Sequence, residues 1–190
     1  MAEKMFCYQC EQTAKGQGCD KSGVCGKNPD VSALQDLLIY ALRGLSLYAV
    51  EAGKKGIAVE GLGPFTAEAL FATLTNVNFD ADRFPALIKK AVEYREGLRQ
   101  KTGLDIIEEA ATFLPAGDVS GLVAQAAAAG LKADDSVDPD LLSLQHIVLF
   151  GIKGVAAYAD HARILGQKDS AVYTFLYIRD CNRTHTCFFA

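Results

Sequence analysis

Residues 34–49 read LQDLLIYALRGLSLYA, and residues 144–159 read LQHIVLFGIKGVAAYA. Both stretches begin with Leu-Gln, place a basic residue before a mid-helix glycine, and end in Tyr-Ala. Any two amphipathic helices share apolar spacing, but the matched polar and glycine positions favour an internal duplication. We therefore expect two equivalent helices, with Tyr48 and Tyr158 in matching environments. Gly44 and Gly154 each cost about 1 kcal/mol relative to alanine, which predicts a close helix crossing at both.

Helical signals continue outward from these two stretches. Ser32 and Gln35 indicate a capping box for a helix over residues 32–52, which Gly53 and Gly56 end. Start and stop residues such as proline, aspartate and glycine predict further helices over residues 64–75, 80–102, 105–113, 120–129, 138–165 and 168–178. Strand signals are weak throughout, so the predicted fold is an all-α bundle.

The duplication predicts an order of domains along the chain. We expect two three-helix-bundle repeats, the second incomplete, preceded by a cysteine-rich loop that binds a cluster. Residues 1–30 would form the loop, 31–104 the first bundle, 105–180 connecting helices and a partial second bundle, and 181–190 a tail. The last segment, DCNRTHTCFFA at 180–190, lacks the length and periodicity of another helix, so the chain is expected to stop inside its second repeat.

The most chemically specific segment is the N-terminal loop. Cys7, Cys10, Cys19 and Cys25 form the pattern C-x2-C-x8-C-x5-C. The residues between them are rich in glycine and poor in apolar side chains, so a bound cofactor rather than a hydrophobic core is expected to order the loop. Four thiolates suit either an iron–sulfur cluster or tetrahedral zinc.

The spacing of the cysteines helps to distinguish a cluster from zinc. A structural zinc site usually has two C-x2-C pairs, whereas only the first pair here has that spacing. The wider C-x5-C pair favours a cubane, whose ligands approach four iron corners. Two disulfides are the alternative without a metal. The N-terminus shows no secretory hydrophobic segment, so reduced thiols and a cytoplasmic location are expected.

Composition excludes few partners. The 190 residues are 50% hydrophobic, with a net charge of −4, so the chain can bury a real core and offers no basic surface for nucleic acid. The longest nearly uncharged runs, near residues 37–42 and 147–152, are too short to span a bilayer. We expect neither a nucleic-acid nor a membrane partner.

Several motifs together resemble one family. MFCYQCEQTAKGQGCDKSGVCGK at 5–27, ALFATLTNVNFDADRF at 69–84 and GIKGVAAYADHARILG at 151–166, with the stretch at 34–49, closely resemble the hybrid-cluster proteins, also called hydroxylamine reductases. The resemblance implies a pair of three-helix bundles and a 4Fe-4S cluster held by the four N-terminal cysteines. It also implies an electron donor protein or reductant, and a catalytic hybrid cluster in domains that this chain lacks.

Two functional classes stay open at this point. The first is a 4Fe-4S electron-transfer domain that relays electrons to a catalytic centre absent from this chain, and that docks to the missing catalytic domains or self-associates. The second is a non-redox helical scaffold or interaction domain, stapled by zinc or without metal. The other polar candidates have less specific explanations. A second metal site at Cys181, His185 and Cys187 is conceivable, but a tail is expected there. His146 and His161 are expected to lie at the surface or to have satisfied partners rather than to be ligands. Glu11, Gln12, Lys15 and Lys21 could tune the potential or dock a donor, but solvated loop residues are expected.

Overall fold

The computed structural model describes residues 4–129 and 138–180. Within these ranges the chain is helical, with a single isolated β-bridge and no strand, which confirms the all-α prediction. The elements in chain order are η1 (Ala14–Gly16), α1 (Pro29–Lys54), α2 (Leu62–Ala72), η2 (Ala81–Arg83), α3 (Phe84–Thr102), α4 (Glu109–Thr112), α5 (Val119–Ala129), α6 (Pro139–Ile164) and α7 (Ser170–Asp180).

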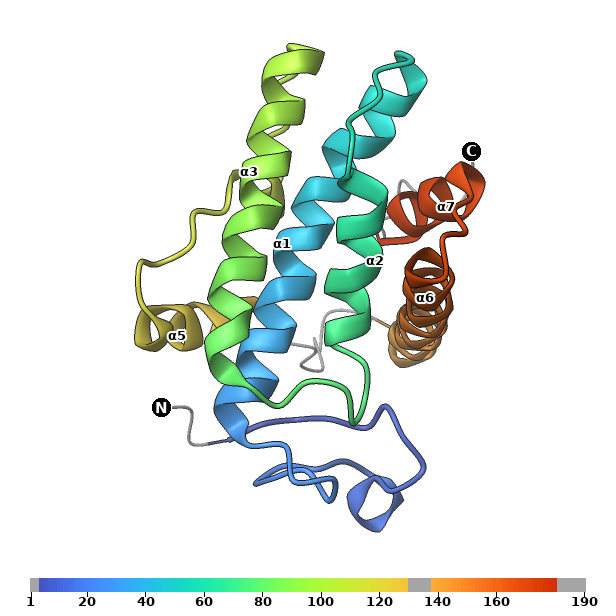
Figure 1. Ribbon diagram of the computed structural model, residues 1–190. Helices are drawn as coiled ribbons and strands as arrows, with labels where there is room; N and C mark the ends of the chain where they lie inside the picture. Colours follow the sequence, from blue (N-terminus) through green and yellow to red (C-terminus); the bar gives the residue numbers. More distant parts are fainter. Residues whose placement is uncertain (1–3, 130–137, 181–190) are drawn as a thin grey trace.

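Helix α1 lies at the centre of the molecule (Figure 1). It packs against α3, α4, α5 and α7, while α2 packs mainly against α6 and α7. Its buried face contributes the largest share of the hydrophobic core, including Leu34, Leu37, Leu38, Ala41, Leu42, Leu45 and Tyr48. The helices predicted for the two repeats therefore pack together, because α2 of the first repeat lies against α6 of the second.

Local signals place several helix ends correctly. Asp138 caps α6 by accepting hydrogen bonds from the N–H groups of Asp140 and Leu141, and Gly103, in the left-handed conformation, ends α3. The capping box at Ser32 and Gln35 is wrong. Helix α1 begins earlier, at Pro29, and Asn28 caps it by accepting from the N–H of Val31 at 2.8 Å. The helix expected over 105–113 is also shorter, comprising only α4.

Gly44 lies at a close contact, as predicted. A Cβ built on Gly44 would lie 1.9 Å from the carbonyl oxygen of Ala110 in α4. That carbonyl also accepts a hydrogen bond at 3.3 Å from Nη1 of Arg95, a buried side chain of α3. The absence of a side chain at Gly44 thus lets α4 lie directly on α1.

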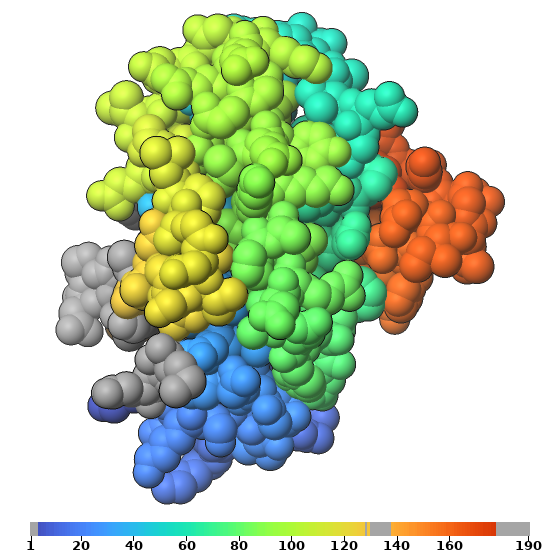
Figure 2. Space-filling model, turned by 60° about the vertical axis from the view of Figure 1, so that its left-hand side comes forward, coloured from blue at the N-terminus to red at the C-terminus, as the bar shows by residue number. Residues whose placement is uncertain are grey.

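The prediction that the two repeat helices lie in matching environments is wrong. Tyr48 is 1% exposed and its hydroxyl accepts a hydrogen bond from the N–H of Ile106 at 3.1 Å, whereas Tyr158 is 80% exposed. A Cβ on Gly154 would meet nothing within 4 Å. In α1 this face is covered by α3, α4 and α5, visible in green and yellow in Figure 2. In the described part of the chain the matching face of α6 has no such cover, and Leu144, Ile147 and Val155 are exposed with Tyr158.

Among the residues that the structure describes, two helices are long and apolar enough to cross a membrane by length and composition. The short uncharged runs in the sequence did not indicate this. The two helices are α1, whose apolar window is 67% buried, and α6, whose window is 28% buried. A core helix of a water-soluble protein passes the same test, so the finding is weak evidence. The expectation of no membrane partner stays a prediction.

Candidate metal centre

The cysteine loop lies across one end of the helical body, next to the start of α1 and α3 and the end of α2 (Figure 1). Its two arms are joined by an isolated antiparallel bridge between Cys7 and Cys19. The N–H of Cys7 donates to the carbonyl of Cys19 at 3.1 Å, and the N–H of Cys19 donates back at 2.8 Å. Backbone pairing therefore places two of the four cysteines opposite each other.

Two glycines let the backbone of the loop lie close to neighbouring side chains. A Cβ on Gly23 would lie 2.9 Å from Sγ of Cys25, and a Cβ on Gly18 would lie 2.4 Å from the ring of Phe6. Both distances are shorter than real Cβ contacts, so a larger residue at either position would require the side chain of Phe6 or Cys25 to shift. Gly23 thus lets the backbone approach the thiol of Cys25, and Gly18 lets it approach the ring of Phe6.

All four cysteines of the loop are free thiols, so the disulfide alternative is not what the structure contains. Cys19 is buried, and Cys7, Cys10 and Cys25 are partly exposed. In residues 4–129 and 138–180, no three His, Cys, Asp or Glu side chains converge as they would around one metal ion. The structure thus places the four predicted ligands on one loop and pairs two of them. Their assignment as ligands stays a prediction.

Two buried lysines anchor the loop to the helices. Lys27 is 4% exposed and donates from Nζ to Oε1 of Gln35 at 2.8 Å. The Nε2 group of Gln35 in turn donates to the carbonyl of Asn78 at 3.1 Å. The residue expected in a capping box therefore ties the end of the loop to the link between α2 and η2.

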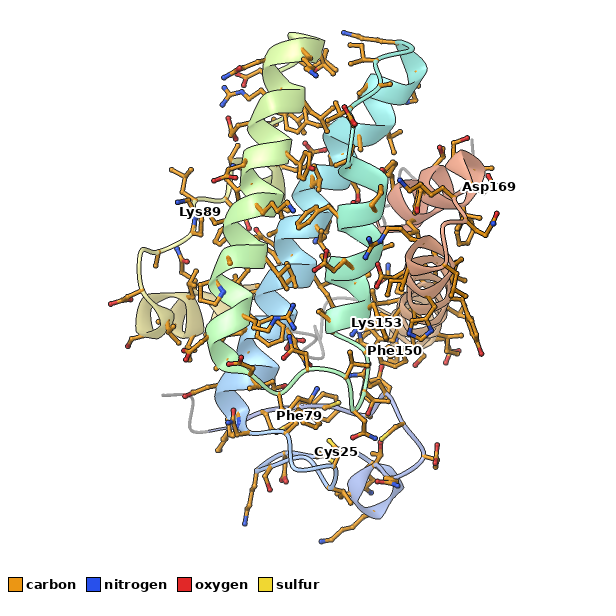
Figure 3. All side chains as sticks on the ribbon, viewed as in Figure 1. Cys25, Phe79, Lys89, Phe150, Lys153 and Asp169 are labelled. Carbon is orange, nitrogen blue, oxygen red and sulfur yellow. The ribbon has the colours of Figure 1, made fainter. Side chains whose placement is uncertain are left out.

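The second lysine comes from α6. Lys153 is 2% exposed, and its Nζ donates to the carbonyl of Thr73 at 3.3 Å and to Oε1 of Gln9 at 3.4 Å. Thr73 is the C-cap of α2, where a cation interacts favourably with the helix dipole. Figure 3 shows Lys153 and Phe150 on the part of α6 nearest the loop that carries Cys25, with Phe79 at the same end.

Aromatic residues pack the same side of the loop onto α6. Tyr8 contacts the rings of His146 and Phe150 at centroid distances of 5.4 and 5.6 Å. Burial raises the pKa of Tyr8 above its usual value, so its phenol is neutral at physiological pH and hydrogen-bonds Nδ1 of His146.

Sequence reasoning found the cysteines but missed these supporting residues. Glu11, Gln12, Lys15 and Lys21 are exposed, consistent with solvated loop residues, while His161 contacts the ring of Phe71 edge-on at 5.1 Å. Among the supporting residues, only Lys153 stood out in the sequence, because it occupies the position that matches Arg43 in the repeat. Cys181, His185 and Cys187 lie outside the described residues.

The donor set fits an iron–sulfur cluster on chemical grounds. Four thiol groups on a single loop supply only soft sulfur ligands, which both iron–sulfur clusters and zinc select. Two backbone positions in that loop leave no room for a side chain, at Gly18 and Gly23. The residues present therefore supply four sulfur ligands of the kind that an iron–sulfur cluster uses.

Comparisons with known proteins show which proteins this chain is similar to. The chain is 59% identical over 178 residues to a protein named hydroxylamine reductase from Syntrophobacter fumaroxidans, covering 91% of this chain and 33% of that protein. Proteins of the same name from Solidesulfovibrio magneticus and Methanocella arvoryzae are 58% and 54% identical, over 91% of this chain and 32% and 33% of theirs. The chain thus spans about one third of the length of these relatives.

A family model matches almost the whole chain, over residues 5–185. Proteins of the matching family bind iron–sulfur clusters. The match includes the cysteine loop, both repeat helices and α7. With relatives above 50% identity over nine tenths of its length, this chain belongs to the Prismane/CO dehydrogenase family.

Proposed function

We propose that this chain is an electron-transfer domain that binds one 4Fe-4S cluster through Cys7, Cys10, Cys19 and Cys25. The observation that carries the proposal is the grouping of four free thiols on one glycine-containing loop, in the spacing C-x2-C-x8-C-x5-C. When bound, the cluster would supply a one-electron redox couple. Membership in a family of iron–sulfur proteins supports cluster over zinc.

The protein residues have separable roles in this proposal. The bridge between Cys7 and Cys19 would hold two ligands in register, and Gly23 leaves room for the thiol of Cys25 beside the backbone of the loop. Lys27 and Lys153 anchor the loop to α1 and α6. The partly exposed position of three cysteines leaves the site within reach of an external electron donor protein or reductant in the cytoplasm.

The relatives named hydroxylamine reductase suggest where the electrons go. We propose that the domain relays them to a catalytic centre built by other residues of an enzyme that reduces hydroxylamine or nitric oxide. The exposed face of α6, with Leu144, Ile147 and Tyr158, offers a surface for docking to such catalytic domains or for self-association.

Metal analysis tests the proposal directly. Protein purified without oxygen should contain about four iron and four sulfide per chain and little zinc. Cys19→Ala should lose most of this iron and expose residues 4–27 to protease, because the loop has little apolar core of its own. Ser22→Ala, at an exposed position of the same loop, should change neither.

Two outcomes would contradict the proposal. Stoichiometric zinc without sulfide would instead support the zinc-stapled scaffold. Full protease resistance of the loop in metal-free protein and in Cys19→Ala would show that the loop folds without any cofactor.

A further inference from the structure

Gln9 lies between a predicted cluster ligand and a buried charge. Its Nε2 group donates to Sγ of Cys7 at 3.7 Å, while its Oε1 accepts from Nζ of Lys153 at 3.4 Å. One amide thus connects a thiol of the N-terminal loop to a side chain of α6. Lys27 and Lys153 line the same narrow pocket beside Cys7, together with Gln9, Gln35 and Phe150.

The lysine determines which way the amide points. An ammonium group has only donors, so Lys153 can bind only the oxygen end of the Gln9 side chain. That contact turns the amide N–H group toward Cys7. The carbonyl of Thr73, at the C-terminal end of α2, holds the ammonium group from the other side.

We propose that Lys153, acting through Gln9, raises the reduction potential of the redox centre that Cys7 helps to hold. The inference rests on the proposed 4Fe-4S function. Reduction adds one negative charge at the thiolate-ligated centre, and hydrogen bonds to the ligand sulfurs are among the factors that set its potential. A buried cation and an N–H donor both stabilise that added charge, and solvent screens them little at a side chain only 2% exposed.

The same geometry gives Lys153 a second, purely structural role as the cap of α2. The two roles predict different results, because a cap affects stability without changing the potential of an intact centre. Lys153 is therefore a positioning residue, and the reduction potential is the measurement that separates the roles.

The experiment measures the midpoint potential of the reconstituted full chain by dye-mediated titration, following the visible and electron paramagnetic resonance spectra. Lys153→Met and Gln9→Leu should each lower the equilibrium constant for one-electron reduction, with Lys153→Met lowering it about tenfold, or about 59 mV. The double variant should shift by less than the sum, because both changes remove the same connection. Lys153→Arg should restore most of the potential.

Lys21→Met is the matched control, because it removes the same charge from an exposed position of the cysteine loop, whereas Lys153 is buried in α6. It should shift the potential much less than Lys153→Met. If Lys153→Met does not fold, Gln9→Leu still tests the connection between Lys153 and Cys7, because Gln9 lies in the loop.

Three results would overturn the inference. If Lys153→Met and Gln9→Leu hold full iron and sulfide but shift the potential no more than Lys21→Met does, the inference about Lys153 is refuted. The proposed function then stays intact. Additive shifts in the double variant would refute the connection through Gln9. Wild-type protein that holds no cluster would overturn both the inference and the proposed function.

Discussion

Replacing each repeat glycine by alanine should have opposite effects on stability. In Gly44→Ala, the new methyl group would lie 1.9 Å from the Ala110 oxygen and 2.5 Å from its carbon, both backbone atoms of α4. Helix α4 must therefore move, which costs about 1–3 kcal/mol as overpacking. Its movement also weakens the hydrogen bond from Arg95 to Ala110, worth about 1.5–3 kcal/mol because the donor is charged.

The gain in helix propensity offsets only part of this cost. Alanine is about 1 kcal/mol better than glycine inside a helix, so Gly44→Ala should lose roughly 2–4 kcal/mol of unfolding free energy. Gly154→Ala keeps the gain, because nothing lies within 4 Å of its Cβ position. At about 2–4 °C per kcal/mol for a domain of this size, the two melting temperatures should differ by about 10 °C.

Thermal and urea unfolding followed by circular dichroism at 222 nm measure both changes, in metal-free protein so that cofactor binding does not contribute. Gly97→Ala in α3, also without neighbours within 4 Å, is a second control for helix propensity. If Gly44→Ala is as stable as wild type, or if Gly154→Ala loses as much stability as Gly44→Ala, the argument from the contact between α1 and α4 is refuted.

Three further predictions follow from single contacts and from the ligand set. Tyr48→Phe should lose about 1 kcal/mol in urea unfolding, because the N–H of Ile106 loses its acceptor; Tyr158→Phe, at an exposed site, should lose almost nothing, and equal losses would contradict the difference between the helices. Asn28→Ala should lose about 1 kcal/mol, because the N–H of Val31 loses its cap, and an unchanged midpoint would show that the cap contributes nothing. A cluster-loaded polypeptide of these 190 residues should exchange electrons with a viologen dye but show no hydroxylamine turnover above that of the reductant, because four cysteine ligands leave no open iron position; robust turnover would contradict the relay.

A candidate site can be named from the sequence where its chemistry is local along the chain. The spacing of the four cysteines predicts a metal-binding loop without any tertiary information. The structure places all four on one loop as free thiols, and their assignment as ligands stays a prediction. The residues around them were not predictable in the same way. Lys153 and Gln9 are separated by 144 positions, and a lysine on an amphipathic helix is usually solvated.

The features of the fold also differ in whether local sequence or tertiary packing decides them. By itself the sequence determined the helical class and ends such as Asp138 and Gly103, because a cap or a left-handed glycine acts on the nearest turn. Only the tertiary structure decided that Tyr48 is buried and Tyr158 exposed, although both stand at matching positions of a repeated sequence. The pattern of a helix specifies which residues share a face, whereas burial of that face depends on which other elements pack against it.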